Sequence, residues 1–184
     1  MRKVVWLLGL VLAFSSAAAA QNASKADLFL GYSYGRIMPQ TSGAGNFNIN
    51  GGASSIAWNL NDSFGIVADF AGYRVGKING FDPDANAFTY LFGPRFSYRR
   101  TKNVTPFAQV LIGGARVSRN LLLPSGSRSA LAMTLGGGVD ADLSKHLALR
   151  LGQLEYFLTR FQEIANDRQT QSNLRFSTGI VFRF

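Results

Sequence analysis

The chain has 184 residues, of which 47% are hydrophobic and 16% charged, and its formal net charge is +9. It contains no cysteine, which excludes disulfide bonds and thiolate metal sites. Apart from one short cluster, the basic residues are scattered as single residues and pairs, so a nucleic-acid partner is not expected.

The first residues have the pattern of a secretory signal. Arg2 and Lys3 precede an apolar run that ends near a row of alanines, as in a signal with its cleavage site. The apolar run is about half as long as a membrane span, which disfavours a retained anchor. We expect residues 1–20 to be removed and residues 21–184 to form a single domain with a formal charge of +7, because the signal carries two basic residues.

The rest of the chain alternates apolar with small or polar residues at a period of two, which is typical of β-strands. No second apolar run of about 18 residues occurs, so helical membrane spans are not expected. Eight strands are predicted, at residues 26–36, 51–59, 64–75, 87–99, 105–118, 128–143, 147–160 and 171–184. Short connections ("LNDS", "RTKNV", "SKH") alternate with long ones, at residues 37–50, 76–86, 119–127 and 161–170. The pattern indicates four hairpin units.

The fourth predicted strand shows which face is apolar. Every second residue from Phe88 to Tyr98 is Phe, Tyr or Pro, whereas the residues between them are small or polar and include Arg95. Such a division suits a barrel in a lipid bilayer, where the outside is apolar and the closed sheet satisfies every backbone group. The predicted fold is therefore all-β, an eight-stranded antiparallel up-and-down transmembrane barrel, whose narrow interior is filled by side chains.

The inward parity carries a set of polar residues. We predict that they form an interior polar network, consisting of Asp69, Arg95, Gln109, Asp140, Arg150, Glu155 and Arg175. A buried charge is costly without a partner, so we expect pairs between neighbouring strands, such as Asp69 with Arg95 and Asp140 with Arg150.

Two strands depart from regular alternation. The parity changes within residues 147–160, which predicts a β-bulge near Gly152. Pro94 removes a ladder hydrogen bond from a sheet without an edge, so a local irregularity is expected there. Aromatic residues near the strand ends are expected to form two interfacial girdles, from Tyr32, Tyr34, Trp58, Phe64, Tyr73, Tyr98, Phe107, Tyr156 and Phe184.

With this plan the chain resembles the OmpA-type eight-stranded outer-membrane barrels, including the small Ail and OmpX group. The resemblance rests on "GYSYGR", "GPRFSY", "TPFAQ", "LGGGVDADL" and the terminal "GIVFRF", in that order along the chain. It implies an outer-membrane location, an interior without a wide channel, and loops that contact host or environmental surfaces. It also implies a signal for the barrel-assembly machinery in the last strand, at Phe176, Ile180, Phe182 and Phe184. No peptidoglycan-binding domain follows the barrel, so cell-wall tethering is not expected.

An enzymatic function has to be considered, because some barrels of this size modify lipid A. The single histidine, His146, lies in a short connection beside Ser144, and Glu155 is roughly 30 Å farther along the strand. A hydroxyl nucleophile needs a neighbouring base, and a zinc site needs three or four ligands close together. We therefore expect no catalytic residues, no metal site and no cofactor.

The expected function is that of a structural or surface protein of the outer membrane, with adhesion or another surface interaction through the long connections. The alternatives are a small-solute channel, a lipid A-modifying enzyme or, if the aromatic parity pointed inward, a soluble lipocalin-like binder. The expected partners are outer-membrane lipids or lipopolysaccharide, the assembly machinery and a surface ligand of the loops, and the protein is expected to be a monomer. The one basic cluster, Arg99, Arg100 and Lys102, is expected to be a solvated turn or to contact lipid phosphates.

Overall fold

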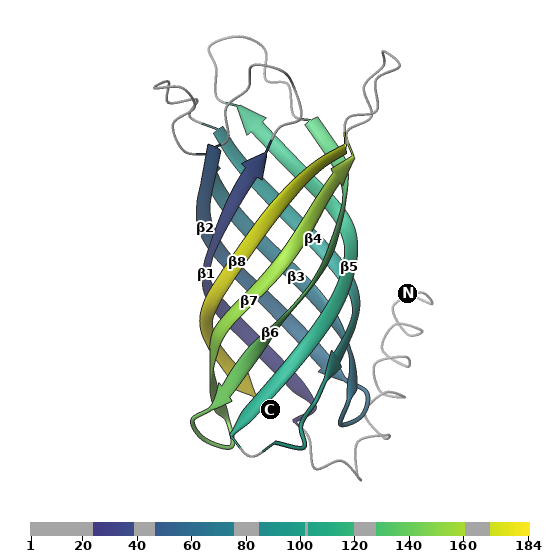
Figure 1. Ribbon diagram of the computed structural model, residues 1–184, viewed down its shortest axis with the longest axis vertical. Coiled ribbons are helices and arrows are strands. Elements are labelled where there is room, and N and C mark those ends of the chain that lie inside the picture. The colour runs from purple at the N-terminus through teal and green to yellow at the C-terminus, as the bar shows by residue number, and fades with distance from the viewer. Residues whose placement is uncertain (1–23, 39–46, 76–84, 102, 120–127, 161–169) are drawn as a thin grey trace, which may run out of the picture.

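The computed structural model describes residues 24–38, 47–75, 85–101, 103–119, 128–160 and 170–184. Eight antiparallel strands follow one another in chain order and close into a barrel through pairing of β1 with β8 (Figure 1). Their bounds are β1 Ala26–Met38, β2 Phe47–Asn59, β3 Phe64–Val75, β4 Ala85–Ser97, β5 Val104–Arg119, β6 Arg128–Asp142, β7 Leu147–Arg160 and β8 Thr170–Arg183. Among the described residues, no helix is long and apolar enough to cross a membrane. The predicted fold class is confirmed.

The two ends of the barrel differ in their connections. Figure 1 shows the short connections and the C-terminus at one end, which we name the turn end. The opposite end, named the loop end, is where β1, β3, β5 and β7 finish. The predicted long connections include residues 39–46, 76–84, 120–127 and 161–169, and these lie outside the described residues, as does the predicted signal at 1–20.

One strand begins earlier than its sequence pattern predicts. The stretch "FNIN" falls within the predicted connection 37–50, but it forms the first residues of β2. Its ladder is continuous with β1, where Phe47 faces Ile37 and Asn48 faces Arg36. Pairing with β1 therefore outweighs the weak strand preference of Asn at these positions.

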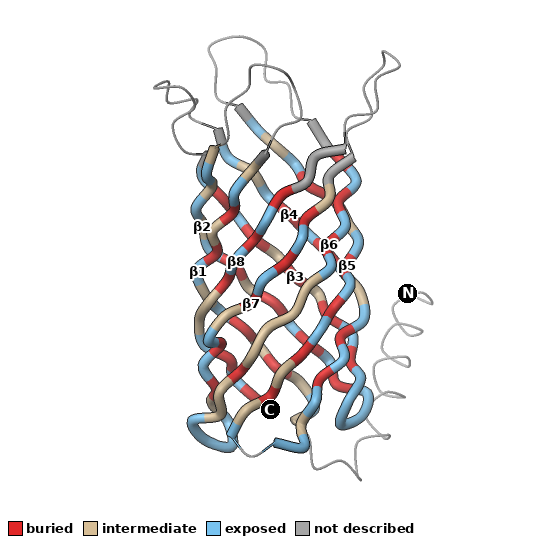
Figure 2. Tube along the Cα trace, viewed as in Figure 1, coloured by how far each residue is buried: buried red, intermediate tan, exposed pale blue. Residues whose placement is uncertain are grey.

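The predicted faces are confirmed by the exposure of the side chains. Figure 2 shows buried and exposed residues alternating along the strands. On β4, Phe92 is 47% exposed on the outside, whereas its neighbour Leu91 is completely buried inside. On β6, Leu135 is 58% exposed and Thr134 is buried. The soluble alternative, with the aromatic parity inside, is therefore wrong.

Two of the predicted girdle aromatics point into the barrel. Tyr73 and Phe107 are 5% and 6% exposed. Each shares its parity with a residue of the predicted interior network, because Tyr73 lies four residues after Asp69 and Phe107 two residues before Gln109. Strand alternation therefore places both rings inside, and position near a strand end is a weaker guide than parity.

The predicted bulge in β7 is confirmed at Leu151 and Gly152. Toward β6, Val139 faces Gly152 while Asp140 faces Arg150, so Leu151 is an extra residue. Toward β8, the ladder passes from Arg150 directly to Gln153. The extra residue keeps Arg150, Gln153 and Glu155 on the inside, although the first is separated from the other two by an odd number of positions.

Pro94 interrupts one ladder, as expected for a residue without a backbone N–H. It faces Ile66 on β3, and the β4–β5 ladder has pairs at Phe92 with Ile112 and at Arg95 with Gln109 but none between them. The register is the same on both sides of the gap. The irregularity is therefore local, and Arg95 still faces inward.

Candidate functional site

A chain of polar side chains crosses the middle of the barrel interior. Arg95 donates from Nε and Nη2 to Oε1 of Gln109, at 3.0 and 2.9 Å. Gln109 Nε2 donates to Glu155 Oε1 at 2.9 Å. Glu155 Oε2 lies 2.5 Å from Arg175, whose Nη1 donates to Asp69 Oδ1 at 2.8 Å. Five of the predicted interior residues thus form one continuous network.

The other two predicted residues form a second group closer to the turn end. Arg150 donates from Nε and Nη2 to the two carboxylate oxygens of Asp140, at 2.7 and 3.1 Å. Its Nη1 donates to Gln153 Oε1 at 2.6 Å. The guanidinium also lies between two rings, 4.3 Å from the centre of Phe29 and 4.5 Å from that of Phe107. A planar cation suits this position, since it bonds in its plane and stacks on its faces.

One predicted pair is present and the other is wrong. Asp140 pairs with Arg150 across β6 and β7. Asp69 pairs with Arg175 instead of Arg95, because on β4 it faces Leu91, four residues from Arg95. Arg95 bonds to Gln109, its direct neighbour on β5, and stacks 4.3 Å from the Phe107 ring.

A further cluster of polar side chains lies at the turn end of the interior. The predicted network did not include it. Asp27 accepts hydrogen bonds from Arg99 at 2.8 Å, from Asn59 at 3.2 Å and from Ser24 at 2.5 Å. Arg183 lies 2.8 Å from Asp142 in the same region. Parity was the available signal, since Asp27 shares it with Phe29 and Arg183 shares it with Arg175.

The predicted basic cluster is divided by this arrangement. Arg99 is half-buried and ion-paired with Asp27, so it is part of the turn-end mouth, whereas Arg100 is exposed. Lys102 lies outside the described residues. Arg100 is thus exposed, as expected for a solvated turn, whereas Arg99 pairs with Asp27 instead.

The interior also contains apolar and hydroxyl groups. Val67, Leu91, Leu111 and Phe157 form a buried cluster with several alanines. In a separate buried group, Ser177 donates to Ser33 at 2.9 Å, and Ser33 lies 3.0 Å from the Tyr73 hydroxyl. These hydroxyls bond to one another and to a backbone carbonyl, with no base beside them in this group.

The residues of the predicted assembly signal lie on the outside of β8. Phe176, Ile180, Phe182 and Phe184 are exposed, Phe184 most of all at 69%. The backbone of Phe184 is fixed to the start of β1, since its N–H donates to Ala26 O at 2.9 Å and its carbonyl accepts from Lys25 N at 2.6 Å. The ring is therefore presented outward from a backbone that closes the barrel, and its role in assembly stays a prediction.

The single histidine does not join the interior groups. His146 lies in the connection between β6 and β7 at the turn end, where it is exposed. Its backbone N–H donates to Ser144 Oγ at 3.3 Å. The interior network is thus built from arginine, carboxylate and amide groups that neutralise one another.

Residues 6–184 match the family model described as the outer membrane protein beta-barrel domain. The chain belongs to this family. No curated protein sequence matches it.

Solved structures of outer-membrane barrels share the fold at low sequence identity. Neisserial surface protein A is 12% identical, with a TM-score of 0.69, over 89% of this chain and 100% of that one. Ail, the attachment invasion locus protein of Yersinia pestis, is 17% identical, with a TM-score of 0.61, over 88% and 99%. The outer membrane protein OprG of Pseudomonas aeruginosa is 10% identical, with a TM-score of 0.54, over 88% and 97%. These likenesses concern the fold alone.

Membership of this family explains the exposed apolar side chains. An outward face of Phe, Tyr, Leu and Ile is unfavourable in water but favourable against lipid. In this outer-membrane barrel the apolar residues on β4 and β6 thus contact the membrane, and the charged groups are drawn into the interior, where they pair.

Proposed function

We propose that this outer-membrane barrel is a non-enzymatic surface component, with a sealed interior and with its activity at the loop end. The observation that carries the proposal is the continuous network from Arg95 to Asp69, in which the side chains bond to one another across the interior. A water-filled channel leaves its lining polar groups exposed, but Arg95, Gln109, Glu155 and Arg175 are all at most 3% exposed. The arrangement thus supports a plug and argues against the small-solute channel.

The enzyme alternative finds no support in the described residues. A hydroxyl nucleophile needs a base in hydrogen-bond reach, and the buried hydroxyls of Ser33, Ser177 and Tyr73 bond mainly to one another. His146 is at the turn end, on the far side of the barrel from the loop end. A structural role for the interior polar groups is the simpler account.

The surface role is supported by the kind of proteins that share this fold. One structural neighbour is named a surface protein and another an attachment invasion locus protein, which has also been solved with a heparin analogue. We propose that residues 1–20 direct export, that the exposed apolar residues of β8 are read by the assembly machinery, and that the folded barrel is a monomer. The loop-end connections are then the part that meets a surface ligand.

Loop replacement tests this function. Residues 39–46, 76–84, 120–127 and 161–169 are exchanged for Gly-Ser segments of the same lengths, and cells that express each variant are tested for adhesion to host-cell and abiotic surfaces. We expect the replaced barrel to reach the outer membrane and to lose adhesion. A matched control exchanges the turn-end connection 60–63, which should keep adhesion. Full adhesion without the loop-end segments would contradict the proposal.

A further inference from the structure

Two aromatic rings and two guanidinium groups alternate in the interior near the turn end. The Arg95 guanidinium lies 4.3 Å from the centre of the Phe107 ring, and that of Arg150 lies 4.5 Å from the same centre. Arg150 is also 4.3 Å from the centre of the Phe29 ring. The four side chains therefore form one series, Phe29, Arg150, Phe107 and Arg95, which we name the cation–aromatic stack.

We propose that Phe107 is the positioning residue of the plug, and that the cation–aromatic stack which it holds together closes the interior to ions. The inference rests on the proposed function insofar as that function includes a sealed interior. It adds the part of the plug that makes the seal, which the hydrogen bonds alone do not identify.

All members of the cation–aromatic stack come from the turn-end part of their strands. Phe29, Phe107 and Arg150 are each the fourth residue of β1, β5 and β7, and Arg95 is the third residue from the end of β4. Each of the four is at most 6% exposed. The interior of an eight-stranded barrel is only wide enough for side chains to fill, so these four large side chains fill much of it near the turn end.

Arg95 depends on the Phe107 ring more than Arg150 does. Arg150 has a carboxylate partner, since it bonds to both oxygens of Asp140. Among the described residues, Arg95 has no carboxylate within salt-bridge distance, and its hydrogen bonds go to the uncharged Gln109. A buried cation without a partner is costly, and the attraction of a guanidinium to an aromatic face is strongest where both are desolvated. The ring therefore supplies the second stabilising partner of Arg95.

The Phe107 ring also keeps two like charges apart. In the closed sheet, β4 and β7 lie on opposite sides of β5. Arg95 reaches the ring from β4 and Arg150 from β7, so the ring lies between the two guanidinium groups. Each cation thereby meets the electron-rich face of the ring instead of the other cation. Without the ring, two buried cations would border a gap, and a polar gap of this kind admits water.

Two glycines make room for the rings. Gly138 is the direct neighbour of Phe107 on β6, and a Cβ atom there would lie 2.8 Å from Phe107 Cζ. At Gly31 on β1, a Cβ atom would lie 2.5 Å from Phe29 Cζ. Carbon atoms that are not bonded to each other prefer a separation of about 3.5–4.0 Å. The two rings thus pack closely against glycine backbone, and the sequence provides space at the positions that the stack needs.

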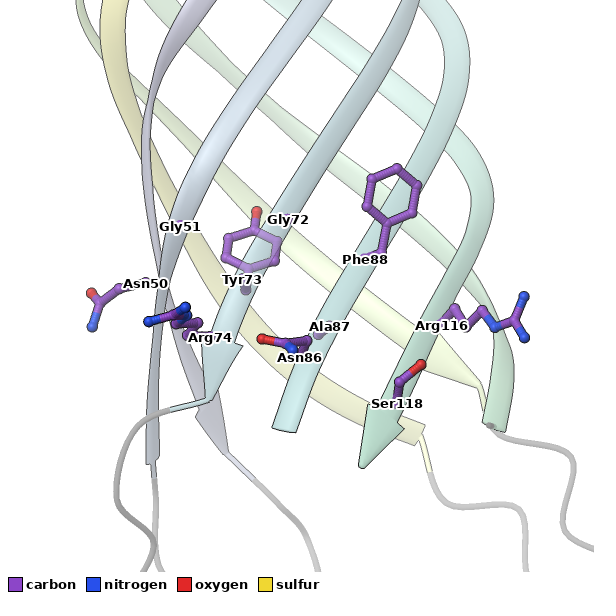
Figure 3. A pocket seen from close by; sticks show the side chains of 10 residues that line it. All are labelled: Asn50, Gly51, Gly72, Tyr73, Arg74, Asn86, Ala87, Phe88, Arg116 and Ser118. Atoms are coloured by element: carbon purple, nitrogen blue, oxygen red, sulfur yellow. The ribbon is translucent and has the colours of Figure 1, made fainter. Parts of the chain in front are cut away.

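The cation–aromatic stack is separate from the loop end of the barrel. A hollow of about 480 Å³ lies at the loop end of β2–β5, and Figure 3 shows the 10 residues that line it. None of the four stacked residues is among them. Substitutions within the stack therefore test the seal without changing a residue of the hollow or of the loop-end connections.

Single-channel recording of a matched pair of variants tests the proposal. Phe107→Ala removes the ring between the two arginines, whereas Phe157→Ala removes the same atoms from a buried ring of the apolar cluster. We expect stepwise currents from Phe107→Ala, and none from Phe157→Ala or from the wild-type barrel. Because arginine side chains that line a pore favour anions, the reversal potential in a tenfold gradient of potassium chloride should shift toward that of chloride.

NMR of the arginine side chains gives a second readout, which does not require an open pore. An aromatic ring shifts the resonances of protons that lie over its face, so the Nε–H signals of Arg95 and Arg150 both report on Phe107. We expect both signals to move in Phe107→Leu, only that of Arg150 to move in Phe29→Leu, and neither to move in Phe157→Leu. The signals are assigned with Arg95→Lys and Arg150→Lys. Each variant is first checked for the gel-mobility shift on heating that marks a folded barrel.

The proposal is overturned if folded Phe107→Ala gives no currents or currents without a preference for chloride, if Phe157→Ala conducts equally, or if the arginine signals stay unchanged in Phe107→Leu. If Phe107→Ala does not fold, the signals in Phe107→Leu decide. Silence of both Phe107→Ala and the wild-type barrel would leave the sealed interior and the surface function intact. Stepwise currents from the wild-type barrel would instead contradict the sealed interior itself, so the two proposals fail separately.

Discussion

Arg175 is the residue on which most of the interior network depends. It lies between two carboxylates, Glu155 and Asp69, on strands β7 and β3, and is 3% exposed. One guanidinium thereby neutralises two acids, and Arg95 is left to bond with the uncharged Gln109. The stability of the plug rests on this cation more than on any single carboxylate.

Replacing Arg175 with Met should destabilise the barrel strongly. The two carboxylates would be left buried without their partner, and loss of one member of a buried pair costs about 3–5 kcal/mol. Urea unfolding of the refolded barrel in detergent measures the loss in the free energy of unfolding. Adding Glu155→Gln and Asp69→Asn to the same variant should recover part of it, and Arg100→Met should change little. An unchanged unfolding midpoint in Arg175→Met would contradict the account.

Sequence alternation identified the interior residues but could not identify all of their partners. Parity alone places Asp69, Glu155 and Arg175 inside. The partner of Asp69 depends on the stagger between strands and on which side chains reach across the interior from β8 to β3. Neither quantity can be read from the sequence of a single strand, so the predicted pair of Asp69 with Arg95 is wrong. The predicted pair of Asp140 with Arg150 is present, because the two residues lie on adjacent strands joined by a short hairpin.

At the scale of the strand, the bulge in β7 corrects the alternation of the sequence. Leu151 is the extra residue, and without it Arg150, Gly152 and Gln153 would follow a regular ladder on both sides. The sequence revealed this bulge because Gln and Glu change parity after Gly152. The sequence did not reveal the early start of β2. The Asn and Gly residues there have a low strand preference, and they form a strand because they pair with β1.

Deleting Leu151 should therefore be tolerated, in contrast to deletions elsewhere in β7. Arg150 would stay opposite Asp140, Gly152 opposite Val139, and Gln153 inside. Deleting Leu154 instead would turn Glu155 toward the lipid, where a charge is costly. The heat-induced shift in gel mobility measures folding, and we expect it for the first deletion and not for the second. Failure of both deletions to fold would contradict this account of the bulge.

At the scale of the whole molecule, the charges are sorted between inside and outside. Five arginines and five acids are paired or hydrogen-bonded within the interior and its mouth, namely Arg95, Arg99, Arg150, Arg175, Arg183, Asp27, Asp69, Asp140, Asp142 and Glu155. Their formal charges sum to zero. The excess positive charge of the chain consequently lies outside the network.

Single-channel recording tests most directly whether the interior of the barrel is a closed plug. The refolded barrel is inserted into a planar bilayer and the current is recorded at constant voltage, beside a porin of known conductance as a control for insertion and sensitivity. Because the charged groups bond to one another across the interior, we predict a baseline without discrete steps. Reproducible stepwise currents from the wild-type barrel would contradict the account.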